Sequence, residues 1–374
     1  MILILRPDIE RMDETYQALM ERLADYEDIE PRAHQVQGKE QRLLEIYLIG
    51  RTSALDSEDM LSLPGVERVV RISDHFPIMG RHADDSRSLD FTYNGVHFSQ
   101  TNLHVFAGLC AVDHREHVEQ TMRALQENGQ TCTRMGAYKP RTSPYSFQGH
   151  GAECLPYVFE LADAYGIRVI AMEVTHEYQI DEIADALDRH NHKTGVMLQI
   201  GTRNAQNFEL LKAAGRQRRF PVLLKRGFGI SLDESLFASE YLASEGNTHV
   251  IFCLRGVKTQ LGEPHRNLVD FAHIPVVKRL TRMPVCIDPS HSVGLRAFGP
   301  DGIQDLCHAT AQGIIAGANM VLVDFHPHPE RALVDGAQAL RLEELPYFLA
   351  DVQLARQCYE QRLILQAKFF ASSL

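Results

Sequence analysis

The sequence has no excess of positive charge, no long apolar run and no low-complexity tract. Its 374 residues carry a formal net charge of −11, whereas nucleic acids and anionic membrane surfaces require a basic footprint on their partners. We therefore expect neither partner, and any anionic ligand must be bound by a local cluster of cations. A membrane span takes about 18 consecutive apolar residues, and no stretch approaches that length.

The cysteines also lack a pattern. They number seven, are scattered along the chain and never form a CxxC pair, so they predict no disulfide framework. A reducing cytoplasm suits them best. The N-terminal segment MILILRPDIE has an apolar run of five residues before Arg6, which is too short for the core of a signal peptide. We expect a cytoplasmic protein.

What is present is ordinary globular composition. Hydrophobic residues make up 44% of the chain and charged residues 23%, which is enough to bury a full core. The length exceeds that of a usual single domain but fits a barrel of about 250 residues together with a smaller module. We therefore expect two domains.

Residues 1–72 predict a ferredoxin-like α+β module. The expected elements, in the order βαββαβ, are a strand at 1–5, a helix at 8–26, strands at 30–36 and 42–49, a helix at 57–63 and a strand at 67–72. Residues 73–87 lose this periodicity and carry Gly, Pro and mixed charge. They are expected to form the linker.

Residues 88–374 predict a (β/α)8 TIM barrel preceded by a hairpin. Asn94-Gly95, flanked by alternating aromatic and β-branched residues, is a strong hairpin signal, and we expect this hairpin to cover one end of the barrel. Helical stretches then separate apolar runs at 104–109, 132–138, 167–173, 196–201, 221–227, 249–256, 284–290 and 320–326. Eight βα units of this spacing favour a closed parallel barrel, whose chemistry lies at the C-terminal strand ends.

Cations gather at these strand ends. They are Arg134, Lys139, Arg203, Lys225 and Arg255. Converging cations repel one another at low dielectric unless an anion neutralises them, and a ligand with both a carboxylate and a phosphate would do so. Arginine suits such planar anions. Taken singly, each residue is better explained as a solvated loop cation, but five such residues at strand ends together favour an anion-binding site.

A possible metal group also stands at strand ends. Cys110, His291, Asp324 and Asp335 offer a thiolate, an imidazole and two carboxylates, a set that binds divalent transition metals. An inert buried thiol and a hydrogen-bonded structural histidine are the simpler explanations of Cys110 and His291 taken alone. Their shared placement after the first, seventh and eighth strands favours the metal site.

Several blocks resemble one known family. GAYKPRTSPYSFQG (136–149), QIGTRNAQNF (199–208), VLLKRGF (222–228), IDPSHS (287–292) and HPHPERALVDG (326–336) are similar to blocks of type I 3-deoxy-D-arabino-heptulosonate 7-phosphate (DAHP) synthases that carry an N-terminal ferredoxin-like regulatory domain. The resemblance covers roughly residues 88–345 well and the first 72 in outline. It implies condensation of phosphoenolpyruvate with erythrose 4-phosphate, the first step of the shikimate pathway, which leads to the aromatic amino acids.

The resemblance also implies roles for individual residues. Phosphoenolpyruvate would be bound by Arg134, Lys139, Arg203, Lys225 and Arg255, and the aldose phosphate by Arg141 and Thr142. The metal positions are Cys110, His291, Asp324 and Asp335, and the catalytic group is Lys139, Glu173, Asp288 and His291. The implied cofactor is a divalent metal, Mn²⁺ first, with Fe²⁺, Co²⁺ or Zn²⁺ as alternatives. A homo-oligomer, dimer or tetramer, and an aromatic amino-acid effector are implied as well.

Four positions depart from the family pattern. The family's Gly-Pro-Cys-Ser has Leu109 in place of proline here, Thr202 replaces a small residue, Leu254 replaces an acidic one, and Asp324 replaces the metal-binding glutamate. These changes leave three hypotheses open. The chain is a DAHP synthase, a related enzyme of a specialised pathway with another acceptor or donor, or a non-catalytic ligand-binding paralogue.

Overall fold

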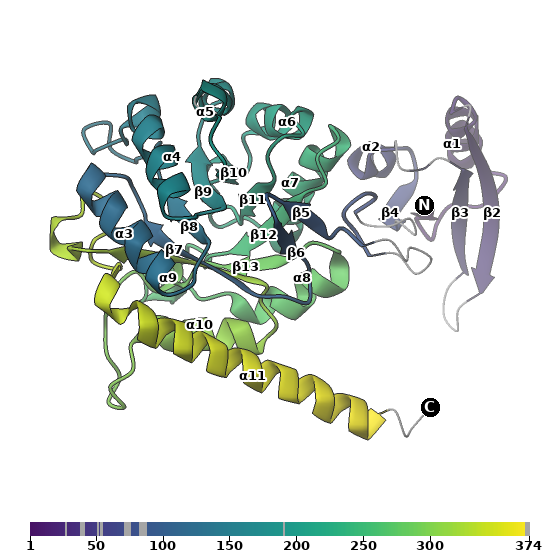
Figure 1. Cartoon of the computed structure of the whole chain (residues 1–374). Coiled ribbons are helices and arrows are strands. Elements are labelled where there is room, and N and C mark those ends of the chain that lie inside the picture. Colours follow the sequence, from purple (N-terminus) through teal and green to yellow (C-terminus); the bar gives the residue numbers. More distant parts are fainter. Residues whose placement is uncertain are drawn as a thin grey trace. The chain divides into compact units, whose positions relative to one another are not determined.

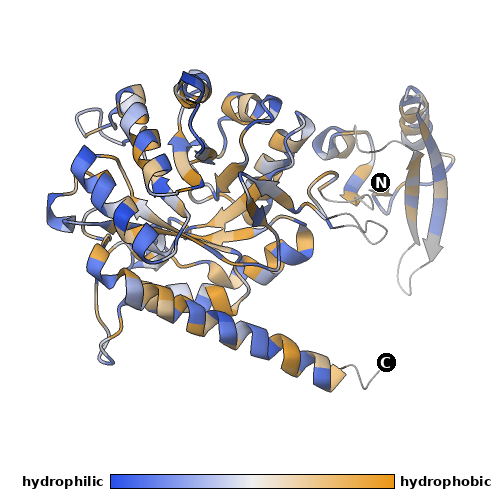
Figure 2. Cartoon of the chain, viewed as in Figure 1, coloured by the Kyte–Doolittle hydropathy of each residue, from blue (hydrophilic) through white to orange (hydrophobic). Residues whose placement is uncertain are grey.

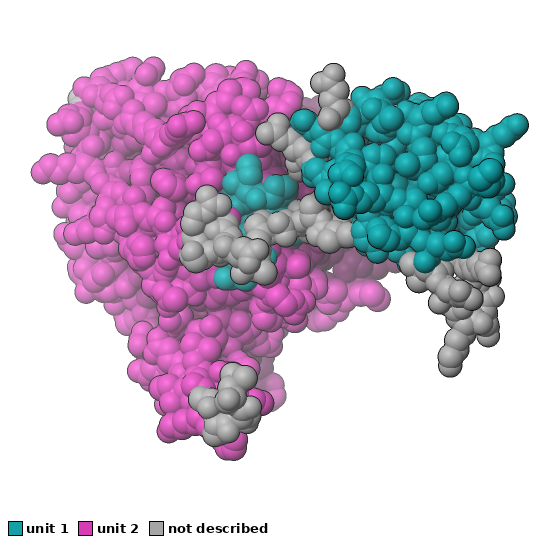
Figure 3. All heavy atoms as spheres, turned by 90° about the vertical axis from the view of Figure 1, so that its right-hand side faces the viewer, with its two compact units in different colours: residues 1–82 teal, residues 83–374 magenta. Residues whose placement is uncertain are grey.

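The structure, a computed structural model, describes residues 1–26, 28–37, 42–50, 52, 55–70, 76–81, 88–189 and 191–370. The chain divides into two compact units, residues 1–82 and 83–374 (Figure 3). Of the predicted linker, residues 73–75 and 82–87 lie outside the described residues, so its boundaries stay predictions. Among the described residues, no helix has the length and apolarity of a membrane span.

Unit 1 has the predicted ferredoxin-like order. Its elements are β1 (Ile2–Leu5), α1 (Glu14–Ala24), β2 (Ile29–Gln37), β3 (Arg42–Gly50), α2 (Ser57–Leu61) and β4 (Val66–Val70). The strands form one sheet in the order β2-β3-β1-β4, with β1 antiparallel to both of its neighbours. Leu3 and Leu5 of β1, Leu19 of α1 and Ile46 of β3 lie in one buried apolar core. This unit therefore has a core of its own.

Helix α1 begins later than the sequence predicted. Asp13 has extended backbone angles, with φ −72° and ψ 143°, and its carboxylate accepts a hydrogen bond of 2.7 Å from the backbone N–H of Glu10. Ile9 is buried. The segment from Asp8 is therefore held as a turn, and the helix starts at Glu14, with Asp13 in extended conformation at the N-cap position.

Unit 2 is a closed parallel barrel (Figure 1). Its strands are β7 (His104–Leu109), β8 (Cys132–Met135), β9 (Val169–Val174), β10 (Gly195–Ile200), β11 (Val222–Lys225), β12 (Val250–Leu254), β13 (Val285–Ile287) and β14 (Met320–His326). They pair in chain order, and β14 returns to pair with β7. Each strand overlaps one of the predicted apolar runs in sequence, so the barrel prediction is confirmed. A short strand, β15 (Leu340–Arg341), pairs in parallel with the last two residues of β14.

Helices surround these strands. They are α3 (Arg115–Glu127), α4 (Leu155–Ala164), α5 (Tyr178–Arg189), α6 (Phe208–Arg216), α7 (Leu232–Ser244), α8 (Ile274–Leu280), α9 (Pro289–Val293), α10 (Asp305–Ile315) and α11 (Leu345–Phe370). Figure 2 shows hydrophobic strands at the centre and helices of mixed hydropathy around them. Parallel strands covered on both faces are expected to be largely apolar, and these are, with charged side chains such as Arg134, Glu173 and Lys225 near their C-terminal ends.

A hairpin closes the N-terminal end of the barrel. Strands β5 (Phe91–Tyr93) and β6 (Val96–Phe98) are joined by Asn94 and Gly95, with φ of 46° and 75°, the positive values that a tight hairpin turn requires. Phe91 and Phe98 pack in one cluster with buried residues of the barrel strands, among them Phe106 and Met320. The predicted cover is confirmed, and it leaves the C-terminal strand ends as the open end.

Candidate active site and metal centre

A cavity of about 300 Å³ lies at the C-terminal ends of the barrel strands. Cations dominate its lining, and carboxylates and an imidazole complete it. The charged and titratable lining residues are Lys139, Arg141, Glu173, Arg203, Lys225, Arg255, Arg266, His291 and Asp335. Of the five strand-end cations predicted from the sequence, all but Arg134 line this cavity. Strands far apart in sequence thus bring these charges to one place, as the barrel prediction required.

Lys139 and Glu173 form a buried ion pair on one wall. Lys139 Nζ lies 3.0 Å from Glu173 Oε2 and 3.5 Å from the sulfur of Cys110. Burial alone would raise the pKa of Glu173, but the attraction of Lys139, Lys225 and Arg134 holds that pKa below its ordinary value. Glu173 is therefore an anion at neutral pH, next to a protonated lysine that faces the cavity.

Arg255 is a buried cation with free donors. Its side chain is 2% exposed, and its Nε and Nη1 have no hydrogen-bond partner among the described residues. The guanidinium lies 5.0 Å from the ring centre of Phe228, and burial lowers the pKa of Arg255. A buried charge with unmade hydrogen bonds is costly, so this group is suited to receive an anion.

The neighbouring cations are held differently. Lys225 Nζ donates to Asp288 Oδ2 at 2.6 Å, while Arg203 is exposed and donates to Thr142 Oγ1 at 3.2 Å. Arg203 also lies 5.3 Å from the Phe228 ring centre. The 139–143 loop and the segment after β10 therefore meet at the cavity. Thr202, one of the departures, lines the cavity too, and its hydroxyl donates to the carbonyl of Arg226.

The predicted metal group is brought together. Ligand atoms of Cys110, His291, Asp324 and Asp335 lie within 4.8 Å of one another. Cys110 Sγ is 3.2 Å from Asp335 Oδ2 and 3.8 Å from His291 Nε2, and that nitrogen is 3.4 Å from Asp335 Oδ2. A thiolate, an imidazole and a carboxylate this close fit a divalent transition metal.

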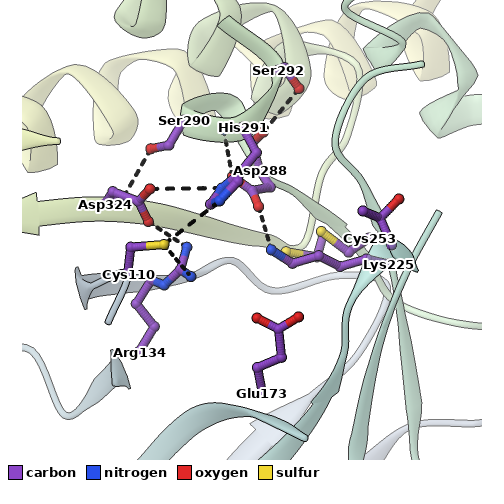
Figure 4. Close-up of polar contacts among 12 residues, drawn as sticks. Cys110, Arg134, Glu173, Lys225, Cys253, Asp288, Ser290, His291, Ser292 and Asp324 are labelled. Carbon is purple, nitrogen blue, oxygen red and sulfur yellow. Dashed lines mark hydrogen bonds and ion pairs between the residues drawn. The ribbon is translucent and has the colours of Figure 1, made fainter. Parts of the chain in front are cut away.

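Asp288 orients His291 from the other side of the ring (Figure 4). Its Oδ1 lies 3.0 Å from His291 Nδ1 and also accepts the backbone N–H of His291, because Asp288 caps the short helix α9. Such a partner fixes which nitrogen faces a metal. Burial alone would lower the pKa of His291, but Asp288 and Asp324 raise it to about 10. Metal binding displaces this proton, so metal affinity should rise with pH.

Asp324 pairs with Arg134 beneath the cavity. Both side chains are buried, at 0% and 2% exposed, and Arg134 Nη1 lies 2.5 Å from Asp324 Oδ1. Gln338 Nε2 donates to Asp324 Oδ2 at 2.6 Å. Arg134 Nη2 also approaches Cys110 Sγ at 3.7 Å. Figure 4 shows Arg134 pointing toward Cys110 and Asp324.

Comparisons with known proteins identify the family to which this chain belongs. Residues 92–359 match the model of the DAHP synthetase I family, and residues 1–74 match that of the DAHP synthase ferredoxin-like domain. The chain belongs to the DAHP synthetase I family. Phospho-2-dehydro-3-deoxyheptonate aldolase of Thermotoga maritima is 38% identical over 315 residues, which cover 83% of this chain and 86% of the relative. A 2-dehydro-3-deoxyphosphooctonate aldolase of Rhodopseudomonas palustris is 29% identical over 259 residues, 66% of this chain and 85% of the relative.

Solved structures agree with this membership. The crystal structure of the Thermotoga maritima DAHP synthase matches with a TM-score of 0.79 at 33% identity and covers 94% of this chain and 96% of that one. A truncated form of the same enzyme has a TM-score of 0.63 and covers 75% of this chain and 95% of that one. The resemblance read from the sequence is confirmed, and this member of the DAHP synthetase I family is a carbon–carbon bond-forming enzyme.

The other departures from the family pattern are buried. Leu109 and Leu254 are 0% exposed, and neither lines the cavity. Leu254 accepts the backbone N–H of Asp288 through its carbonyl. Since only Thr202 among the changed residues faces the cavity, the ligand surface of this DAHP synthase family member is altered at one point.

Several residues that form hydrogen bonds around the site were not predicted from the sequence. Arg266 lines the cavity and donates to Asp335 Oδ1 at 3.1 Å and to Gln338 at 2.8 Å. Asp270 accepts Arg226 Nη1 at 2.9 Å and the backbone N–H of Gly256 at 2.8 Å, so it links the segments after β11 and β12. Gln338 could have been predicted to lie near the site, because it follows Asp335 closely in sequence. The others come from loops without a pattern.

A second group, Asp113, His117 and His326, also has ligand atoms within 4.8 Å of one another. Its hydrogen bonds explain it without a metal. The backbone N–H of His328 donates to His326 Nδ1, so the proton of neutral His326 sits on Nε2 and points at Asp113 Oδ2, 2.8 Å away. Metal binding at Nε2 would need an unfavourable imidazolate. This group therefore joins the segment after β7 to the end of β14.

We expect Asp113→Asn to lower the free energy of unfolding at pH 7 by about 1.5–3 kcal/mol, the range for hydrogen bonds to a charged group. Burial alone would raise the pKa of Asp113, but hydrogen bonds from His326 and His117 lower it to about 2. Because this pKa is lowered by folding, Asp113 stabilises the fold at pH values above its unfolded pKa, which is near 3.9. The stabilisation is lost as the pH falls toward 2.

Urea unfolding at pH 7 and pH 3 measures the effect. The difference between wild type and Asp113→Asn should shrink at the lower pH, and Asp185→Asn, at an exposed position of α5, is the control. A difference that grows on acidification would contradict this role of Asp113.

Proposed function

We propose that the protein condenses phosphoenolpyruvate with erythrose 4-phosphate to give DAHP and inorganic phosphate. The observation that supports this most is the cation-lined cavity that borders the Cys110, His291 and Asp335 group. The buried Arg255 in this lining has guanidinium donors without a partner among the described residues and is suited to an anion, and phosphoenolpyruvate carries both a phosphate and a carboxylate. The 38% identity to the Thermotoga maritima aldolase supports the same reaction.

The donor would be bound by the buried cations. Arg255 has unpaired guanidinium donors, and Lys225 lies beside it in the cavity. These groups suit the phosphate, since charge-assisted hydrogen bonds to a phosphate are strong in a desolvated site. Lys139 and Arg203 line the same cavity and can reach the carboxylate. The acceptor phosphate would lie at the outer rim with Arg141 and Thr142, since Thr142 is exposed.

The chain's own residues can handle the protons. C3 of phosphoenolpyruvate attacks the aldehyde carbon, and Lys139 Nζ, which faces the cavity, can protonate the resulting alkoxide. Water adds at C2, and Glu173, anionic beside Lys139, can accept the proton that the water releases. The bond between C2 and the bridging oxygen then breaks, the leaving phosphate takes up the proton of the new C2 hydroxyl, and C2 becomes a ketone.

A divalent metal fits the residues at Cys110, His291 and Asp335. Their donor atoms lie 3.2–3.8 Å apart and are of the types that transition metals prefer. When bound, such an ion supplies Lewis-acid polarisation of the aldehyde carbonyl. Asp288 keeps His291 turned so that Nε2 faces this position.

Acceptor choice tests the proposal. Phosphoenolpyruvate supplies three carbons, so a heptonate product needs a four-carbon acceptor and an octonate product a five-carbon one. We expect kcat/KM to be at least about tenfold higher, about 1.4 kcal/mol in transition-state binding, with erythrose 4-phosphate than with arabinose 5-phosphate. Continuous phosphate-release assays at equal enzyme concentration measure both. A preference for the five-carbon aldose would contradict the proposal.

Unit 1 is proposed to regulate or oligomerise the enzyme, with an aromatic amino acid as effector. Among the described residues, those that line the cavity all belong to unit 2, and unit 1 has a core of its own. We expect a fragment that begins at Ser86 to bind phosphoenolpyruvate within about threefold of the full chain, since each unit is compact. Isothermal titration of both proteins, with circular dichroism to check folding, measures this. A folded fragment that no longer binds would contradict the division of roles.

A further inference from the structure

We propose that Asp324 is not a metal ligand in this chain but a positioning residue that holds Arg134, so that the metal is held by Cys110, His291 and Asp335 alone. The proposal deepens the proposed function, because it concerns the same centre. Proximity alone would include Asp324, since one of its oxygens lies within 4.8 Å of the other ligand atoms. Its contacts and its side of the imidazole exclude it.

The ring of His291 separates the two carboxylates. Cys110 Sγ and Asp335 Oδ2 lie 3.8 Å and 3.4 Å from Nε2, whereas Asp324 Oδ2 lies 3.8 Å from Nδ1. Nδ1 already has Asp288 Oδ1 at 3.0 Å. A metal that binds Nε2 therefore has Cys110 and Asp335 beside it, whereas the contact of Asp324 with the ring is at Nδ1.

The three remaining atoms have the spacing of a metal site. Bonds of about 2.0–2.3 Å to a tetrahedral metal place neighbouring ligand atoms roughly 3.3–3.8 Å apart. The triangle of Cys110 Sγ, His291 Nε2 and Asp335 Oδ2 has sides of 3.2, 3.4 and 3.8 Å. These atoms could accept an ion with small shifts, and two of the three residues, His291 and Asp335, line the cavity.

Asp324 has other hydrogen-bond partners, and breaking these contacts would cost free energy. Its Oδ1 accepts from Arg134 Nη1 at 2.5 Å and its Oδ2 from Gln338 Nε2 at 2.6 Å, and the Ser290 hydroxyl accepts its backbone N–H. If the carboxylate turned to a metal, Arg134 would be a buried cation without its ion pair, which is strongly unfavourable. An aspartate is also one methylene shorter than the glutamate that the family pattern has here.

Charge balance supports the same assignment. A divalent ion with one thiolate, one carboxylate and a neutral imidazole forms a neutral unit, while Arg134 and Asp324 neutralise each other separately. Without the Asp324 carboxylate, the ligand set has fewer oxygen atoms and is softer than the four-residue set. A softer set favours Co²⁺ or Zn²⁺ over Mn²⁺. The role of Asp324 is then to hold the Arg134 guanidinium near Cys110 Sγ, 3.7 Å away.

Titration of the apoprotein with Co²⁺ alone tests this, with the thiolate-to-cobalt absorption band and the d–d bands as readouts. Asp335→Asn should lower Co²⁺ affinity at least about a hundredfold. Asp324→Asn should lower it by at most about tenfold, the lower bound for residues outside the ligand set, and should leave the band positions unchanged. Asp324→Glu should add an oxygen ligand, change the d–d bands and raise Mn²⁺ affinity more than Co²⁺ affinity.

The double variant Arg134→Gln/Asp324→Asn guards against loss of folding, because it removes both buried charges together. Its cobalt spectrum should match that of wild type. Equal losses of affinity in Asp324→Asn and Asp335→Asn, or altered d–d bands in the double variant, would overturn the proposal. None of these readouts needs turnover, so a wild type that binds Co²⁺ in this way but does not condense its substrates would contradict the proposed function and leave this inference standing.

Discussion

Cys110→Ser is expected to reduce phosphate release at least about a thousandfold, which corresponds to about 4 kcal/mol of transition-state stabilisation. Cys110 is the soft ligand of the proposed centre, 3.2 Å from Asp335 Oδ2 and 3.8 Å from His291 Nε2. A hydroxyl is a poor substitute for a thiolate toward late transition metals. Metal content by elemental analysis should fall together with the rate.

Cys358→Ser is the matched control, because Cys358 is an exposed free cysteine on α11 and does not line the cavity. It should keep wild-type metal content and rate. Full activity of Cys110→Ser in the presence of a chelator would remove the metal from the account of the reaction.

Arg255→Met is expected to have opposite effects on the free protein and on ligand binding. The free protein should melt at the same or a higher temperature, because a buried charge with unpaired Nε and Nη1 is replaced by an apolar side chain of similar length. kcat/KM for phosphoenolpyruvate should fall at least about a thousandfold, since the anion loses a desolvated guanidinium partner.

Thermal melts with and without phosphoenolpyruvate separate the two effects. Phosphoenolpyruvate should raise the Tm of wild type but not that of Arg255→Met. Arg189→Met, at an exposed position at the end of α5, should behave like wild type in both assays. A marked loss of stability in free Arg255→Met would show that Arg255 serves the fold instead of the ligand.

The sequence predicted those features that depend on local pattern. Continuous apolar runs predicted the barrel strands, because strands covered on both faces cannot alternate. Asn94 and Gly95 predicted the hairpin, because few other residues take a positive φ so readily. The predicted start of α1 was wrong, because residues 8–13 form a turn that is held by the Asp13 side chain and by backbone hydrogen bonds of Ile9 and Asp13.

The site was predictable in part. Strand-end positions predicted that Lys225 and Arg255 converge, since every parallel strand of a barrel ends at the same face. The partners of those residues were not predictable. Arg134 was expected among the ligand-binding cations, yet it is paired with Asp324 beneath the cavity, and this pairing joins residues 190 positions apart. Such contacts depend on packing across the barrel, which no local pattern encodes.

One measurement tests the central claim most directly. Purified protein is incubated with phosphoenolpyruvate, erythrose 4-phosphate and, in separate reactions, Mn²⁺ or Co²⁺, and both phosphate release and the mass of the product are recorded. We expect one phosphate released for each seven-carbon sugar acid phosphate formed, and neither product without erythrose 4-phosphate. If the metal-loaded protein demonstrably binds phosphoenolpyruvate but forms no condensation product, the proposed function is contradicted.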